Sequence, residues 1–347
     1  MRYRMFGART GLRVSELALG TGTFGTRWGY GAGPEDVPRI FERFAEAGGN
    51  FLDCADAYQF GQAEALLGEL VAADRDHFVI ATKYTLGAEP DGGVSRTGNG
   101  RKNMLRSVEA SLRRLGTDRI DLYWAHMADG LTPIEEIARG FEDLVRAGKV
   151  LHVGLSDFPA WRVARAATLA ELRGWAPVAG IQVEYSLVER TPDRELLPMA
   201  EALGLAVTAW SPLGGGLLSG KYRRGEAGRL TAWGNLIHAE RGPRETAILD
   251  AVEAVAGEAG ATPARVAVAW VRAKGLFPIL GPRTPAQLDD TLGALTITLS
   301  ADQLRRLDEA SAVPLGFPHD FLAGERNRAR LAGGKAELLE RPRRAVA

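Results

Sequence analysis

Four side chains in the first third of the chain have the types and spacing needed to deliver a proton to a carbonyl oxygen: Asp53, Tyr58, Lys83 and His126. Each lies at or just after the C-terminal end of an apolar run, and the runs read FLDCADAY, FVIATK and IDLYWAH. Asp53 and Lys83 are 30 residues apart (83 − 53), and Lys83 and His126 are 43 apart (126 − 83). Each interval is about one strand plus one helix, so neighbouring parallel strands would bring all four side chains to one rim of a barrel.

Reduction of a carbonyl adds hydride to carbon while negative charge grows on oxygen, so a proton donor with a pKa near the working pH must lie close to that oxygen. Tyrosine, with an ordinary pKa of about 10, is too weak an acid by itself. An ammonium at Lys83 would favour the phenolate and lower the pKa of Tyr58. A buried Lys83 needs a counter-charge, which Asp53 supplies. His126 would then donate a hydrogen bond that orients the carbonyl.

Each of the four residues also has a structural explanation when it is considered alone. The aspartate would be a turn residue, the lysine a solvated strand end, the tyrosine a packed aromatic and the histidine a satisfied core residue. Four required types on adjacent strand ends are an improbable coincidence. The combination therefore favours a catalytic site.

Composition narrows the classes of partner. Lys plus Arg equals Asp plus Glu, at 43 each among 347 residues, which argues against nucleic acid or an anionic membrane surface because both require clustered positive charge. The single cysteine, Cys54, excludes an internal disulfide. The start of the chain lacks the pattern of a signal peptide, and no stretch approaches the roughly 18 apolar residues of a membrane span. We therefore expect a cytoplasmic protein without membrane or nucleic-acid partners.

Eight short runs rich in Val, Ile, Leu and aromatic residues predict strands, and most are continuously apolar, as in strands covered on both faces. They span 17–20, 51–55, 78–83, 120–126, 150–156, 180–186, 205–211 and 277–281. Amphipathic stretches lie between them. The stretch 102–116 ends at Gly116, and four others begin with Thr-Pro, at 132, 191, 262 and 284. The alternation predicts an α/β fold, a (β/α)8 TIM barrel, with a doubly wound open sheet as the alternative.

The chain 1–347 is expected to be one domain with a core of about 3–312. Residues 2–17 read as a β-hairpin, turning at Arg9 to Gly11, that would plug the bottom of the barrel. The segment 213–243 is long for a loop and follows the seventh strand, which predicts a lid. The tail of about 320–347 is expected to form a helix over the barrel mouth or to be partly disordered.

The glycines of GTGTFG (20–25) match the dinucleotide fingerprint, but the next helical pattern starts only after Gly33-Pro34. Because the fingerprint requires a helix that opens within the glycines, we interpret this segment as a bend beside the substrate pocket.

The stretches FLDCADAYQFGQAEALLGE, ATKY, IDLYWAHMAD and VLHVGLSDF resemble successive motifs of the aldo-keto reductase superfamily, and the resemblance covers about residues 3–312. It is strongest toward bacterial members similar to aryl-alcohol dehydrogenases and to potassium-channel beta subunits. The resemblance implies a TIM barrel that uses NADPH or NADH, with Tyr58 as the proton donor, Lys83 and Asp53 lowering its pKa and His126 orienting the substrate.

The resemblance also implies the cofactor site. Ser156, Asp157 and Gln182 would contact the carboxamide and Tyr185 would stack on the nicotinamide. Further cofactor contacts are implied at Ser211, Leu213, Gly216, Leu218, Lys221, Gly281, Arg283, Thr284, Gln287 and Asp290. Arg283 and Thr284 match contacts to the 2′-phosphate at a helix N-terminus, which favours NADPH over NADH. Asp157 and Thr291 stand where the family usually has Asn.

The substrate is expected to be a small aldehyde or ketone in an apolar pocket. Its candidate contacts are Phe24, Trp28, Tyr30, Tyr84, Met127 and Trp233. No metal is expected, because the five histidines show no paired ligand spacing. Two other functions stay open: an NADP(H)-binding regulatory protein with little turnover, and a hydrolase using two carboxylates from among Asp53, Asp129 and Glu184. A homo-oligomer is compatible with the sequence.

Overall fold

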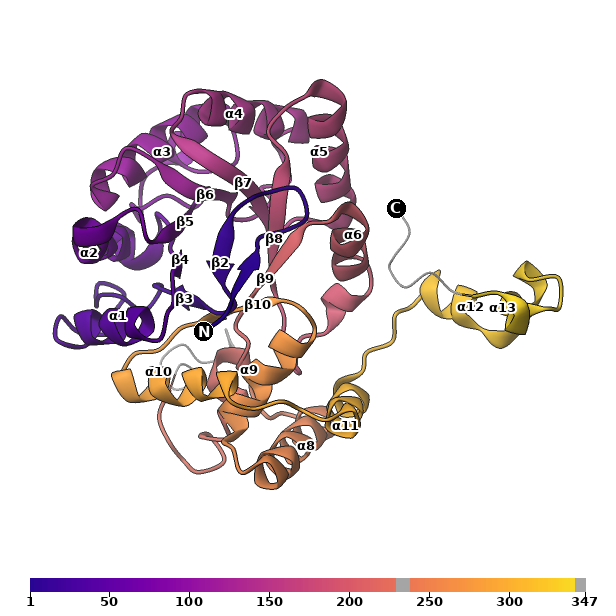
Figure 1. Cartoon of the computed structure of the whole chain (residues 1–347). Coiled ribbons are helices and arrows are strands. Elements are labelled where there is room, and N and C mark those ends of the chain that lie inside the picture. Colours follow the sequence, from indigo (N-terminus) through magenta and orange to yellow (C-terminus); the bar gives the residue numbers. More distant parts are fainter. Residues whose placement is uncertain (229–237, 341–347) are drawn as a thin grey trace.

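A computed structural model describes residues 1–228 and 238–340. Eight parallel strands close a barrel in the order β10-β3-β4-β5-β6-β7-β8-β9 (Figure 1). The strands are β3 (Ala18–Gly20), β4 (Phe51–Asp53), β5 (Val79–Tyr84), β6 (Ile120–Ala125), β7 (Val150–Ser156), β8 (Val178–Glu184), β9 (Ala206–Trp210) and β10 (Phe277–Leu280). Their ends differ from the predicted runs by two residues at most. The closed barrel confirms the predicted fold class and excludes the open sheet.

Most strand residues are apolar because the strands are largely covered on both faces. Every residue of β5 and β6 is buried, between the barrel interior and the surrounding helices. The register aligns Gly20 with Asp53, and Lys83 with Trp124. Since all eight strands are parallel, their C-terminal ends meet at one rim, where the predicted site residues lie.

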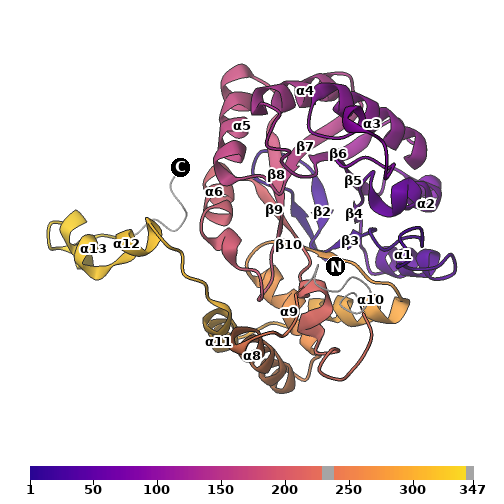
Figure 2. The ribbon, with the colours of Figure 1, turned by 180° about the vertical axis from the view of Figure 1, so that it is seen from behind.

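Helices pack around the outside of the barrel (Figures 1 and 2). They are α1 (Asp36–Glu46), α2 (Gln62–Val71), α3 (Arg101–Leu115), α4 (Ile134–Arg146), α5 (Ala160–Arg173), α6 (Leu196–Leu203), α8 (Pro243–Ala259), α9 (Pro263–Ala273), α10 (Pro285–Leu292) and α11 (Ala301–Ser311). Thr262 and Thr284 are N-caps, accepting hydrogen bonds from the amides of Arg265 and Gln287, as the Thr-Pro signals predict.

The two other Thr-Pro signals do not begin helices in that way. At the first, Pro133 rather than Thr132 occupies the N-cap of α4, because the Thr132 hydroxyl donates to Asp129 instead. At the second, residues Thr191–Asp193 form the short 3₁₀ helix η4, and α6 begins only at Leu196.

The N-terminal hairpin is confirmed: β1 (Tyr3–Met5) pairs antiparallel with β2 (Arg13–Ser15). Phe6, just after β1, is fully buried. Its ring centroid lies 5.6 Å from that of Phe51, 6.2 Å from that of Trp124 and 5.6 Å from that of Phe277. These side chains belong to a second hydrophobic cluster, separate from the main core. The hairpin therefore closes the N-terminal end of the barrel with a packed aromatic group.

Two predictions for the later segments have different outcomes. After α11 the chain leaves the barrel, and α12 (His319–Ala323) and α13 (Glu325–Leu331) stand to one side of it (Figures 1 and 2), so a helix over the barrel mouth is wrong. The predicted lid includes residues 229–237, with Trp233, which lie outside the described residues, so the lid stays a prediction. Among the described residues, no helix combines the length and apolarity required to span a membrane.

We expect Phe6→Ala to lower the free energy of unfolding by about 3–5 kcal/mol, because it empties a fully buried aromatic site. Urea denaturation measures this difference. Met5→Ala, at a position of β1 that is 48% exposed, is the control and should change the free energy of unfolding by less than about 1 kcal/mol. Equal effects of the two substitutions would show that the hairpin does not close the barrel.

Candidate active site

A cavity of about 680 Å³ opens at the C-terminal rim of the barrel. Three residues of the predicted tetrad, Asp53, Tyr58 and His126, line it, and Lys83 lies directly behind Tyr58. Gly20, Gly22 and Thr23 also line the cavity, so the glycine-rich segment borders the pocket as expected. The structure therefore brings all four side chains to one place.

Lys83 organises this group. Its ammonium is completely buried and makes three hydrogen bonds, to Asp53 Oδ2 at 2.7 Å, to the Cys54 carbonyl oxygen at 2.7 Å and to the Tyr58 hydroxyl at 3.1 Å. The other carboxylate oxygen, Asp53 Oδ1, accepts from Gln182 Nε2 at 2.9 Å. Because an ammonium has three N–H groups, each finds an acceptor, and the position of the Tyr58 hydroxyl is fixed.

The pKa of Tyr58 differs in direction from the prediction. Burial raises it, the charge of Lys83 lowers it, Asp53 raises it again, and the result lies above the ordinary value. The expected effect of Lys83 is present, but it does not outweigh burial. Burial lowers the pKa of Lys83 itself, yet Asp53 and Tyr58 together raise it above its usual value. At neutral pH the site therefore holds a protonated phenol beside a charged ammonium.

His126 is neutral at physiological pH, because burial and the charge of Lys83 lower its pKa to about 3. Its ring meets that of Tyr58 edge to face at a centroid distance of 5.9 Å. The buried Nδ1 atom has no hydrogen-bond partner among the described residues. A neutral imidazole carries one N–H, which is what orienting a carbonyl oxygen requires.

A strained turn places Tyr58. It begins the 3₁₀ helix η1 (Tyr58–Gly61), in which Gln59 and Phe60 have positive φ angles of 51° and 54°. The Gln59 side chain donates to the carbonyl oxygens of Gly22 and Tyr30 and accepts from the amide of Trp28. Such conformations cost about 1–3 kcal/mol each and persist where the surroundings enforce them. The turn is thereby fixed to the loop that follows the neighbouring strand β3.

Most predicted cofactor residues line the same cavity. They are Ser156, Asp157, Gln182, Ser211, Leu213, Gly216, Lys221, Gly281, Arg283, Gln287 and Asp290. Gly216 is in the 3₁₀ helix η5 (Gly214–Ser219), with a φ of 97°, and a Cβ atom there would lie 2.8 Å from Lys221 Nζ. The lysine end could move away, so the positive φ is what favours glycine at this position. Thr291 lines the cavity too, but its hydroxyl donates to the Gln287 and Leu288 carbonyl oxygens of its own helix.

The prediction that Tyr185 faces the rim is wrong. Its buried ring stacks on Trp270 at 5.3 Å, and its hydroxyl donates to Asp193 at 2.7 Å, in the helical layer. Side chains alternate along a strand, so Gln182 faces the cavity and Tyr185, three positions later, faces the helices. The aromatic residue at a strand end that does line the cavity is Trp210, at the end of β9. The run LAVTAWS contained that signal, since it places this tryptophan at a strand end.

Five further candidates do not line the cavity. Phe24 and Leu218 are fully buried in the core, and Tyr84 is buried with its hydroxyl donating to the Asn99 carbonyl oxygen. The Thr284 side chain is used as a helix cap. Trp28 lies edge-on to Tyr58 at 5.9 Å, outside the lining. The strand alternation that points Lys83 inward turns Tyr84 outward. Met127 and Tyr30, by contrast, are in the lining.

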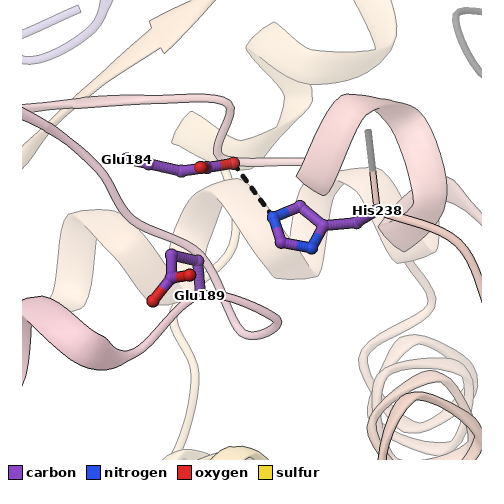
Figure 3. Close-up of side chains that lie close together, drawn as sticks. All are labelled: Glu184, Glu189 and His238. Carbon is purple, nitrogen blue, oxygen red and sulfur yellow. Dashed lines mark hydrogen bonds and ion pairs between the residues drawn. The ribbon is translucent and has the colours of Figure 1, made fainter. Parts of the chain in front are cut away.

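Neither alternative acid lies in the cavity lining. Asp129 binds the amides of Asn99, Leu131 and Thr132, which fixes a loop. The carboxylate of Glu184, at the end of β8, pairs with His238 Nε2 at 3.0 Å, next to Glu189 (Figure 3). That hydrogen bond raises the pKa of His238. The paired carboxylates expected of a hydrolase are thus not assembled from these residues.

Asp56 is a buried acid that the sequence analysis missed. Burial, and then the nearby charge of Glu64, raise its pKa to about 7, although Arg114 opposes this. Its Oδ1 atom has no hydrogen-bond partner among the described residues. Between its ordinary pKa and about 7 the folded chain holds a proton that the unfolded chain has lost. The free energy of unfolding therefore falls as pH rises through this window.

Asp56→Asn should raise the free energy of unfolding at pH 8 by roughly 4 kcal/mol, because the amide stays neutral where the acid must ionise and the window up to about 7 spans about three pKa units of about 1.4 kcal/mol each. Urea denaturation at pH 5 and pH 8 measures the gain, which should be less than half as large at pH 5, because only the lower part of the window between the two pKa values has been crossed there. A gain of the same size at both pH values would contradict the raised pKa.

Comparison with known proteins supports a single family. A model of the Aldo/keto reductase family matches residues 16–312. The chain is 35% identical to norsolorinic acid reductase of Aspergillus flavus, over 92% of this chain and 84% of the relative. It is 40% identical to the uncharacterized oxidoreductase YrpG of Bacillus subtilis, over 91% and 98%. It is 35% identical to aryl-alcohol dehydrogenase [NADP(+)] of Phanerodontia chrysosporium, over 92% and 88%.

Proposed function

The chain belongs to the aldo/keto reductase family and is an oxidoreductase, and we propose that it reduces small aldehydes and ketones, aromatic ones among them, with NADPH. The contact between Lys83 Nζ and the Tyr58 hydroxyl at 3.1 Å, at the floor of the cavity, carries this proposal. The Tyr58 acid lines the cavity, within reach of a bound carbonyl oxygen, and its electrostatic partner Lys83 lies directly behind it. The family acts on small-molecule carbonyl compounds, which fits the cavity size.

The proton comes from Tyr58. When bound, the reduced cofactor supplies a hydride to the carbonyl carbon, and the Tyr58 hydroxyl gives its proton to the oxygen. The phenolate that remains is stabilised by the ammonium of Lys83, which Asp53 keeps charged. Neutral His126 donates its N–H to the same oxygen and holds it toward Tyr58. The raised pKa of Tyr58 keeps the proton on the phenol until negative charge develops on the substrate oxygen.

The residues that line the cavity match the chemical groups of nicotinamide adenine dinucleotide phosphate. The face of Trp210 offers a flat apolar surface for the nicotinamide ring, and Ser156 and Gln182 lie nearby on adjacent strands. Lys221, Arg224 and Arg283 contribute positive charge to the cavity for the phosphates. The residues present therefore fit the group.

Arg283 is the residue we assign to the 2′-phosphate. Its guanidinium lies over the ring of Tyr30 at 4.3 Å, in the lining. Polar atoms of Thr284 and Gln287 are already hydrogen-bonded at the start of α10. The Thr284 hydroxyl accepts from the Gln287 amide, and Gln287 Oε1 accepts from the Arg283 amide. We therefore assign recognition of the negatively charged 2′-phosphate to the guanidinium of Arg283. The relative from Phanerodontia chrysosporium, whose name includes NADP(+), supports the same cofactor.

We expect Tyr58→Phe to lower turnover about 10²–10⁴-fold while NADPH binding is retained, because the ring stays and only the acid is lost. NADPH oxidation with 4-nitrobenzaldehyde, followed by absorbance, measures turnover, and fluorescence titration measures binding. Turnover near that of the unmodified protein would remove Tyr58 from the mechanism.

The same assay tests the regulatory alternative. A single-turnover experiment with bound NADPH and excess aldehyde should oxidise the cofactor within the time of one catalytic cycle. Binding of NADPH without its oxidation would favour a cofactor-binding regulatory protein, and no binding at all would refute both functions.

Arg283→Ala should raise the Michaelis constant for NADPH at least about 10-fold and leave that for NADH nearly unchanged, because a charge-assisted contact to the extra phosphate is lost. Steady-state kinetics with both cofactors measures this. Arg326→Ala, on the exposed helix α13, is the control and should change neither constant. An equal rise for NADPH and NADH in Arg283→Ala would contradict recognition of the 2′-phosphate.

A further inference from the structure

One acid in the cavity has no part in the proton path. Asp157 follows directly after β7 and lines the cavity beside Ser156. Its Oδ1 atom accepts from Trp210 Nε1 at 3.1 Å, and its Oδ2 atom accepts from the Ser156 hydroxyl at 3.4 Å. No lysine or arginine forms a salt bridge with it among the described residues. The carboxylate is therefore held in place without being neutralised.

The backbone around Asp157 ties it to the reacting end of the cavity. Its φ of 52° is left-handed, a conformation in which Asp and Asn are enriched. Its amide donates to the Gln182 carbonyl oxygen at 3.0 Å, and the Gln182 side chain in turn binds Asp53. The hydrogen bond from Trp210 sets the carboxylate at the edge of the ring proposed to hold the nicotinamide.

We propose that the carboxylate of Asp157 makes this protein bind the oxidised cofactor more tightly than the reduced one. The inference rests on the proposed function, since it needs the nicotinamide at Trp210. The two cofactor forms carry the same phosphates and differ in the ring, which is cationic when oxidised and neutral when reduced. A fixed negative charge beside the ring attracts only the oxidised form, and only such a differential contact can shift an equilibrium.

The preference would assist carbonyl reduction. A bound reduced cofactor would supply hydride to the carbonyl carbon and would become cationic in its ring, while Tyr58 gives its proton to the oxygen. Asp157 stabilises that charge where it forms. It acts as a positioning and electrostatic residue, with no bond made or broken at its own atoms.

Other charged and titratable groups surround Asp157. Lys83 on β5 and Glu184 on β8 act on it with opposite signs, and Glu184 is itself paired with His238 (Figure 3). Asp53, Tyr58 and His126 share the cavity lining. Enclosure by protein atoms, only partly offset by the bond from Trp210, raises the pKa of Asp157 to about 6. The charge therefore appears between about pH 5 and 7, which makes its effect measurable.

The test compares the dissociation constants of NADPH and NADP+ by fluorescence titration between pH 5.5 and 8, for the unmodified protein and Asp157→Asn. Asparagine keeps the size and the left-handed backbone, so the fold is preserved. In the unmodified protein the ratio of the NADPH constant to the NADP+ constant should rise with pH. In Asp157→Asn this ratio should be about tenfold lower at pH 8 and should not change with pH. A tenfold change in the ratio corresponds to a difference of one unit in the pKa of Asp157 between the complexes with NADPH and NADP+.

Glu226→Gln is the charge-matched control, because Glu226 also lines the cavity but ion-pairs with Arg224. It should change both constants by one factor and leave their ratio unaltered. A ratio unchanged by Asp157→Asn, or a pH dependence that persists in that variant and so belongs to His238, would overturn the inference while leaving the proposed function intact. Failure of both nucleotides to bind the unmodified protein would instead overturn the proposed function.

Discussion

The buried ammonium of Lys83 is the constraint on which the rest of the site depends. An ammonium withdrawn from water is costly unless charges and acceptors surround it, and Asp53, the Cys54 carbonyl and Tyr58 fill that role. These partners come from neighbouring strands and the turn after β4, so the barrel register must hold them together. The same requirement keeps Tyr58 at the cavity floor. The contacts that stabilise the buried ammonium are thus the same contacts that position the proposed proton donor.

Electrostatics in this site works by a balance of opposed effects. Burial raises the pKa of Tyr58 and lowers that of His126, while the lysine lowers both. The outcome is a protonated phenol beside a neutral imidazole, so both groups can donate to the same oxygen. A carboxylate at Asp157, which accepts from Trp210, adds negative charge to the lining of the same cavity. The cavity therefore carries separated charges in a chain whose net charge is zero.

Much of the fold and of the catalytic group could be predicted from the sequence for a physical reason. Strands buried on both faces are mostly apolar, so the positions of their ends can be predicted from the sequence. Parallel strands then bring equivalent ends together. Lys83 and His126 follow from that argument without any knowledge of side-chain packing. The helix N-caps at Thr262 and Thr284 could be predicted because capping depends on local sequence and backbone geometry. The cap expected at Thr132 failed because a distant acid, Asp129, captures its hydroxyl.

The sequence by itself determined the barrel, the group of Asp53, Tyr58, Lys83 and His126, and the family. Only the tertiary structure decided which aromatic residue meets the cavity, Trp210 rather than Tyr185, because inward and outward directions alternate along a strand and depend on the exact register. It also decided the direction of the Tyr58 pKa and revealed the buried acid Asp56. Those properties depend on how much water is excluded and on charges from distant segments, which are set only when the chain has packed.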